Sequence, residues 1–251
     1  RDMIYEAILL RAGVLRVDST EELFESVESL TRMKPLKGER LAIVANGIGG
    51  AILAVDRLVH EGGQLAELSD ETVDKLSAVL PGYWSQSNPI DITPEAGPSV
   101  YRDVLKIVEE DKGVDAILVL FSPTSVVNSQ DVANVVVHHS KFYQKNLLTS
   151  WMGGATVERS RHVFDDAGIP TYDTPDRAVK AFMHMVRHQR NHELLRETPS
   201  SLMDNISIDR PLCQSIVQSA LDQDRSYLTA EEIYKILKAY EFKQVKTDFI
   251  P

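Results

Sequence analysis

Short apolar runs alternate with amphipathic stretches from about residue 39 to residue 176, and this alternation predicts strands that alternate with helices. Continuous apolar runs are typical of parallel strands that are buried on both faces. The expected strands lie at 41–45, 64–67, 88–92, 115–121, 146–151 and 169–172, with helices between them. The pattern therefore predicts an α/β fold, in which a parallel sheet of about five to six strands is covered by helices on both faces.

A helical lead-in precedes this region. Residues 1–13 form an apolar pattern that predicts a helix, with Gly13 as its C-terminal cap. Residues 14–17 predict a short strand or an extended piece. A second helix follows, for which Ser19 is the expected N-cap and Glu22 is expected to complete a capping box.

The character of the chain changes after about residue 190. A polar stretch at 196–205 predicts a linker, and two helices and an edge strand are expected at 211–221, 229–240 and 243–246. This segment is too short for a second complete core. The chain is therefore expected to have three parts, which are the lead-in at 1–37, the α/β domain at 38–190 and a linker with the start of a further domain at 191–251.

A glycine-rich turn follows the first predicted strand of the sheet. Its residues are Asn46, Gly47, Ile48, Gly49 and Gly50, and a helix begins there. Glycines let a ligand approach the backbone closely, and the first turn of a helix offers unpaired N–H groups at the positive end of its dipole. The turn therefore predicts a site for phosphate or another anion. The alternative is a turn needed only for strand–helix packing.

Neither of the common nucleotide motifs fits this turn. The glycine spacing differs from the dinucleotide fingerprint, and no Gly-Lys-Ser/Thr follows as in a P-loop. In a parallel sheet, ligands bind beyond the carboxyl ends of the strands. Four loops are expected on that rim, at 46–50, 91–97, 122–128 and 152–155.

Two of these loops are expected to support the glycine turn. Asn88 and Asp91 flank the third predicted strand, and Asp91 could accept hydrogen bonds from the N–H groups of the glycine turn. An Asx turn is the equally weighted alternative for Asp91. Gly153 and Gly154 repeat the strand–glycine–helix pattern after the fifth predicted strand and could provide a second anion contact, whereas Trp151 before them is expected in the core.

Composition excludes several classes of function. A net charge of -10 without a cluster of basic residues argues against a nucleic-acid binder. The single cysteine, Cys213, excludes a disulfide framework and fits a small apolar side chain on a helix in a cytoplasmic protein. No apolar run is long enough to cross a membrane.

The seven histidines do not predict a metal site. His184, His188 and His192 share one helical face, but no cysteine or paired carboxylate completes a ligand set. They are expected near a helix C-terminus, where a partly charged imidazole suits the dipole.

A series of motifs in fixed order resembles one family, the NDP-forming acyl-CoA synthetases, which are relatives of succinyl-CoA synthetase. The resemblance covers residues 1 to about 190 and continues weakly at 227–232 and 237–240, where it resembles the entry to an ATP-grasp domain. The motifs are Ala12-Gly13-Val14, Glu21-Glu22-Leu23-Phe24, Asn46–Gly50, Leu65–Ser69, Asn88-Pro89-Ile90-Asp91, Asp115–Val119, Trp151–Gly154 and Gly168-Ile169-Pro170.

This resemblance implies a flavodoxin-like, doubly wound domain that presents the helix after Asn46–Gly50 to a phosphohistidine. The phosphorylated histidine of the family lies before the segment that matches Arg1, so none of the seven histidines takes its role. The chain is then a fragment with no bound cofactor. CoA, ATP or ADP and Mg are implied for the full-length protein, with the CoA-binding and ATP-grasp domains of the same protein as partners and a homo-oligomer as a possibility.

Two other functions compete with this interpretation. Similar domains occur in protein lysine acetyltransferases, where they form a non-catalytic region that senses acyl-CoA, and Glu241 departs from the Tyr-Gly pattern of the synthetases. A phospho-receiver would need an aspartate cluster after the first strand. Asn46 and Gly47 occupy that place, so the receiver is set aside.

Overall fold

The computed structural model describes residues 2–196 and 209–245, which belong to two compact units divided after Arg196. Helix α8 (Pro175–Arg196) runs without interruption through residue 190, where the sequence suggested a boundary. The expected linker at 196–205 lies outside the described residues, except for Arg196 at the end of α8.

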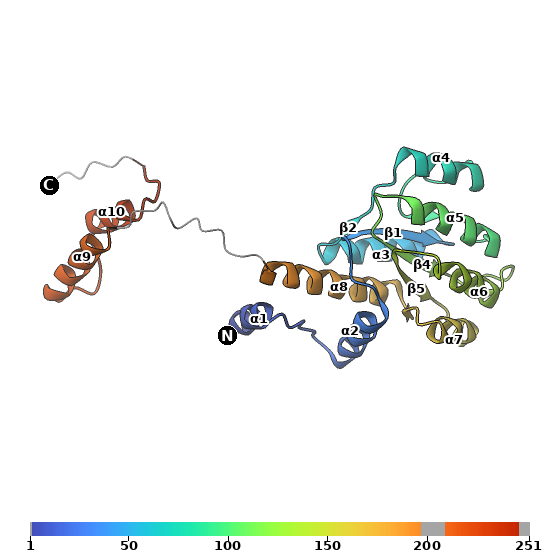
Figure 1. Ribbon diagram of the computed structural model, residues 1–251, viewed down its shortest axis with the longest axis horizontal. Coiled ribbons are helices and arrows are strands. Elements are labelled where there is room, and N and C mark those ends of the chain that lie inside the picture. The colour runs from blue at the N-terminus through green and yellow to red at the C-terminus, as the bar shows by residue number, and fades with distance from the viewer. Residues whose placement is uncertain (1, 197–208, 246–251) are drawn as a thin grey trace. The chain divides into compact units, whose positions relative to one another are not determined.

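The first unit contains a six-stranded parallel sheet (Figure 1). Its strands are β1 (Arg40–Ala45), β2 (Gln64–Leu65), β3 (Ile90–Asp91), β4 (Ala116–Phe121), β5 (Asn146–Trp151) and β6 (Thr171–Tyr172). The order is β2–β1–β4–β5–β6. The short β2 and β3 share one edge of β1, because β2 pairs with its first residues and β3 with its last. The predicted parallel α/β fold is confirmed.

Helices cover both faces of this sheet, so the fold is doubly wound and flavodoxin-like. Helices α3 (Ile48–His60) and α8 pack on one face. The opposite face carries α4 (Asp70–Val79), α5 (Pro98–Glu110), α6 (Ser129–Ser140) and α7 (Glu158–Asp166). Because the helix after β1 and the helix after β4 lie on different faces, the direction of winding changes between these two neighbouring strands.

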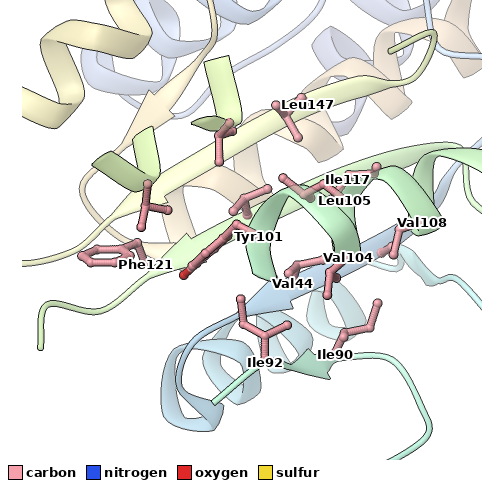
Figure 2. Close-up of a cluster of buried hydrophobic side chains, with 14 of the residues drawn as sticks. Val44, Ile90, Ile92, Tyr101, Val104, Leu105, Val108, Ile117, Phe121 and Leu147 are labelled. Carbon is pink, nitrogen blue, oxygen red and sulfur yellow. The ribbon is translucent and has the colours of Figure 1, made fainter. Parts of the chain in front are cut away.

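Alternation along the strands sorts the buried side chains between the two faces. On β4, Ile117 and Phe121 point toward α5, whereas Leu118 belongs to the cluster under α3 and α8. Figure 2 shows Tyr101, Val104, Leu105 and Val108 of α5, which pack on the face of the sheet that carries Ile117 and Phe121. Trp151 is fully buried and stacks on Phe121 with ring centroids 5.4 Å apart, which confirms its expected place in the core.

The lead-in consists of α1 (Asp2–Arg11) and α2 (Thr20–Arg32). Gly13 adopts a φ of 70° after α1, as expected for its cap position, but the segment 14–17 forms no strand. Ser19 caps α2 by accepting a hydrogen bond from the Glu22 N–H. The capping box was a wrong prediction, because the Glu22 carboxylate accepts from the N–H of Asp18 instead of that of Ser19.

The second unit is a helical hairpin of α9 (Arg210–Asp222) and α10 (Ala230–Ala239). Thr229 and Glu232 form a complete capping box at the start of α10. Residues 243–245 form no strand, so the predicted edge strand is wrong there, and Lys246 lies outside the described residues. Cys213 is buried on α9, as expected for a small apolar side chain.

Candidate functional site

The first turn of α3 presents its N–H groups at the carboxyl edge of the sheet. Gly47 is the N-cap in an extended conformation and provides no side-chain cap. Within residues 2–196, no acceptor takes a hydrogen bond from the N–H of Gly47, Ile48, Gly49 or Gly50. Ile48 and Gly49 are exposed, and Gly47 and Gly50 are half-buried. This helix start is therefore open to an incoming hydrogen-bond acceptor.

The glycines of this turn differ in what surrounds them. A Cβ on Gly50 would lie 2.8 Å from Cε of Met152, so a larger residue there would require the end of the Met152 side chain to move aside. A Cβ on Gly49 would meet no atom within 4 Å, and its φ lies outside the left-handed region. Alanine is favoured over glycine in helices by about 1 kcal/mol. Packing and backbone conformation therefore leave the glycine at position 49 unexplained, whereas close approach by a ligand would explain it.

The Asn46 side chain holds the glycine turn to the neighbouring strand. Its Oδ1 accepts from the Ser122 N–H at 2.7 Å, and its Nδ2 donates to the Ser122 carbonyl at 2.9 Å. Asn46 is only 1% exposed, so its amide does not face solvent. The contact joins the ends of β1 and β4, the two strands between which the winding changes direction. Asn46 thus positions α3, while the backbone of the following residues remains available.

Asn88 and Asp91 form hydrogen bonds with backbone groups away from the glycine turn. Asn88 accepts from the Ile43 N–H at 2.9 Å and donates to the carbonyls of Leu41 and Ala66, which fastens the edge of β1 at the point between its pairing with β2 and its pairing with β3. Asp91 accepts from the Thr93 N–H at 3.0 Å, the Asx turn that was one of the two alternatives. The described residues contain no hydrogen bond from the glycine turn to Asp91.

The loop after β5 contacts the glycine turn through one side chain. Gly153 and Gly154 have φ values of 122° and 55°, and a short 3-10 helix, η1 (Gly154–Thr156), follows. Met152 lies against Gly50, as its distance from a Cβ there shows. A Cβ on Gly153 would come within 2.5 Å of Pro123. The loops after β1, β4 and β5 therefore hold one another in place around the start of α3.

His184 does not lie at a helix C-terminus, in contrast to the prediction. It lies in the middle of α8, is buried, and its Nδ1 contacts the Ser26 hydroxyl. Burial lowers the pKa of His184, and Arg187 acts in the same direction, while Glu22 and Glu61 oppose them. The imidazole is therefore neutral at pH 7. The prediction is wrong for His184 because α8 continues for twelve more residues to Arg196, whereas His192 does lie near that end of the helix.

The described residues contain neither a metal-binding cluster nor a membrane-spanning helix. Residues 2–196 and 209–245 hold no group of three or more histidine, cysteine or acidic side chains placed to bind a metal ion. Every helix in these ranges is too short or too polar to span a bilayer.

The fold and the open helix start define a doubly wound domain with unpartnered N–H groups at the carboxyl edge of its sheet. The Ligase-CoA domain family matches residues 41–195 of the chain, which is more than half of its length. The chain therefore belongs to this family, as the resemblance to NDP-forming acyl-CoA synthetases predicted.

Curated relatives include two ADP-forming ligases. The acetate–CoA ligase I of Archaeoglobus fulgidus is 30% identical over 94% of this chain and 33% of its own length. The 4-hydroxybutyrate–CoA ligase of Nitrosopumilus maritimus is 27% identical over 95% of this chain and 34% of its own length. The chain thus spans about a third of these relatives, and it is homologous to their ligase domain.

A solved structure shares the fold. The dinucleotide-forming acetyl-coenzyme A synthetase 1 of Candidatus Korarchaeum cryptofilum matches with a TM-score of 0.73 and 27% identity, over 77% of this chain and 43% of that chain. It has been solved in an apo form and in complex with phosphate and ADP.

Proposed function

We propose that this chain is the part of an ADP-forming acyl-CoA ligase that receives a phosphohistidine at the start of α3. The overall reaction interconverts acyl-CoA, ADP and phosphate with the free acid, CoA and ATP. The phosphorylated histidine comes from outside this chain. The observation that carries the proposal is the group of unpartnered N–H groups at Gly47–Gly50, together with a glycine at position 49 that packing does not require.

Elementary electrostatics explains why this edge suits a phosphoryl group. Each N–H of the first helical turn is a hydrogen-bond donor without a partner in the helix, and the helix dipole adds about 0.3–1 kcal/mol for a nearby negative charge. The Asn46 bridge to Ser122 and the packing of Met152 on Gly50 fix the donors before the ligand arrives. Donors that are already in place need little reorganisation as charge develops during the transfer of the phosphoryl group.

The glycine turn after β5 has a secondary role in this proposal. Gly153 and Gly154 hold the loop whose Met152 supports Gly50, and Asn88 and Asp91 shape the strand edges beside it. In this proposal CoA, the nucleotide and Mg bind to other domains of the ligase, as the resemblance to the synthetase family implies. The ligands of the archaeal synthetase, phosphate and ADP, agree with phosphoryl chemistry.

The regulatory alternative has less support. The relatives that match almost the whole chain are ADP-forming CoA ligases, and these comparisons favour the enzyme over an acyl-CoA-sensing region of an acetyltransferase.

The substitution Gly49→Ala tests the proposal in the complete ligase. A methyl group at this position would meet no atom within 4 Å apart from its chain neighbours and the backbone of its own helix, and in this proposal it would hinder the approach of the phosphoryl group. We expect ATP-dependent formation of acyl-CoA to fall by about tenfold or more, because the phosphoryl group loses hydrogen bonds that form in the transition state. The melting temperature of the same variant should stay unchanged or rise, since alanine favours the helix.

Gly82→Ala is the matched control, because a Cβ at Gly82 also meets no atom within 4 Å and its φ is not left-handed. This variant should keep full activity. Full turnover in the Gly49→Ala enzyme would show that the start of α3 does not receive the phosphoryl group.

A further inference from the structure

Helix α2 carries three of its four apolar side chains on the side that faces solvent, while the fourth, Leu30, packs against the core cluster under α3 and α8. Phe24 is 70% exposed, and Leu23 and Val27 are about half exposed. These three residues lie at positions i, i+1 and i+4 of the helix and therefore share one face. The opposite face buries Glu25, Ser26 and Ser29. This arrangement departs from the usual amphipathic pattern, in which most large apolar side chains of a surface helix face the core.

The buried face of α2 is held by specific polar contacts. Glu25 forms an ion pair with Arg177, and Ser26 contacts His184. The hydroxyl of Ser29 lies 2.7 Å from that of Tyr172. Buried polar groups need such partners, and here each one has found its partner on α8 or β6.

These contacts fix the rotation of the helix about its axis. Turning α2 to bury Phe24 would break the ion pair of Glu25 with Arg177 and leave the buried hydroxyl of Tyr172 without its Ser29 partner. The polar contacts of α2 with α8 and β6 therefore hold Leu23, Phe24 and Val27 on the side that faces solvent. We call these three residues the outer face of α2.

We propose that the outer face of α2 is the docking surface for an apolar surface on the remaining domains of the ligase. The opposite face holds this helix in place, so the large apolar side chains of the outer face stay exposed. An exposed apolar cluster of this kind is typical of a protein–protein interface. The A. fulgidus relative aligns with 94% of this chain, a share too large to omit α2, and two thirds of that ligase lie outside the alignment. The neighbouring α1 also buries none of its side chains, although Ile4, Tyr5 and Ile8 are apolar.

This inference rests on the proposed function only for the identity of the occupant, and its test does not depend on turnover. A single cysteine is placed on the outer face as Phe24→Cys, with Cys213→Ser removing the native thiol. The rate of labelling with a maleimide is then measured in the 251-residue chain and in the complete ligase. We expect labelling to be about tenfold or more slower in the complete ligase, because a covered thiol reacts only when the interface opens.

Tyr83→Cys in the same background is the control, since Tyr83 is 80% exposed in the connection between α4 and β3. It should react equally fast in both proteins. Val27→Cys provides a second probe of the outer face and should be protected together with Phe24→Cys. Equal rates for both probes in the two proteins would overturn the proposal. Protection that appears in the 251-residue chain alone and grows with its concentration would also overturn it, because the occupant would then be a second copy.

Discussion

At the residue scale, the side chain of Asn46 decides how the glycine turn is presented. It uses both its acceptor and its donor on the backbone of Ser122, a residue that follows a different strand. The sequence motif suggested that Asn46 itself contacts the anion. Its burial shows instead that the amide is engaged within the protein, so the N–H groups of the next four residues are the part of the motif left for a ligand.

The substitution Asn46→Asp is expected to destabilise the first unit. Aspartate keeps the acceptor for the Ser122 N–H but replaces the donor with a carboxylate oxygen that faces the Ser122 carbonyl. Loss of a buried hydrogen bond with an unsatisfied group costs about 1–3 kcal/mol. Urea unfolding of the 251-residue chain measures this change.

Asn128→Asp is the control for this change. Asn128 caps α6 and accepts hydrogen bonds from Gln130 and Asp131 through Oδ1. Aspartate is as good an N-cap as asparagine, so this variant should keep its stability. If both variants unfold at the wild-type urea concentration, the Asn46 bridge contributes nothing to the fold.

At the scale of elements, α2 is attached to α8 through polar groups that include a titratable one. Burial lowers the pKa of His184 in the folded state below its usual value of 6.5. The unfolded chain therefore binds the proton more readily than the folded chain does. The stability that the neutral His184 contributes is fully present above the pKa of the unfolded chain. It is lost as the pH falls toward the lower pKa of the folded chain.

We expect the melting temperature of the first unit to fall between about pH 7.5 and pH 5.5, and His184→Gln to make this fall smaller. Differential scanning calorimetry at several pH values measures both effects. His139 and His188 also have lowered pKa values because of burial, so part of the fall should remain in the variant. An exposed histidine, His162, offers the control His162→Gln, which should leave the pH dependence as it is. A pH dependence that His184→Gln leaves unchanged would contradict this assignment.

At the scale of the whole molecule, the two units differ in the core that each can form. The sheet unit buries two large apolar clusters, one on each face. Among residues 209–245, Cys213 and Ala220 are the only buried apolar side chains. A helical hairpin with so little buried apolar surface is marginal by itself.

A chain that ends at Arg196 is therefore expected to unfold in one cooperative transition with an unchanged melting temperature. Circular dichroism during heating compares it with the 251-residue chain. A peptide of residues 209–245 should show no cooperative transition of its own. A marked loss of stability on removal of residues 197–251 would mean that the first unit depends on the second.

Local patterns in the sequence were sufficient for most of the fold. The apolar strands at 116–121 and 146–151 and the cap at Ser19 were predictable because they depend on residues close together in the chain. The sequence left the outcome open, or missed it, where the local pattern does not specify the partner. Residues 14–17 have strand-forming side chains but no neighbouring strand, and Asp91 forms an Asx turn that the sequence left equal to a contact with the glycine turn.

The sequence by itself determined the alternating architecture, the position of the glycine turn and the family to which the chain is similar. Only the tertiary structure decided that Asn46 bridges to Ser122, that His184 is a buried neutral partner of Ser26, and that α2 turns three of its apolar side chains outward. The physical reason is the separation of the partners. Helix and strand periodicity is written in neighbouring residues, whereas these contacts join residues 76 and 158 positions apart, which only the packed fold brings together.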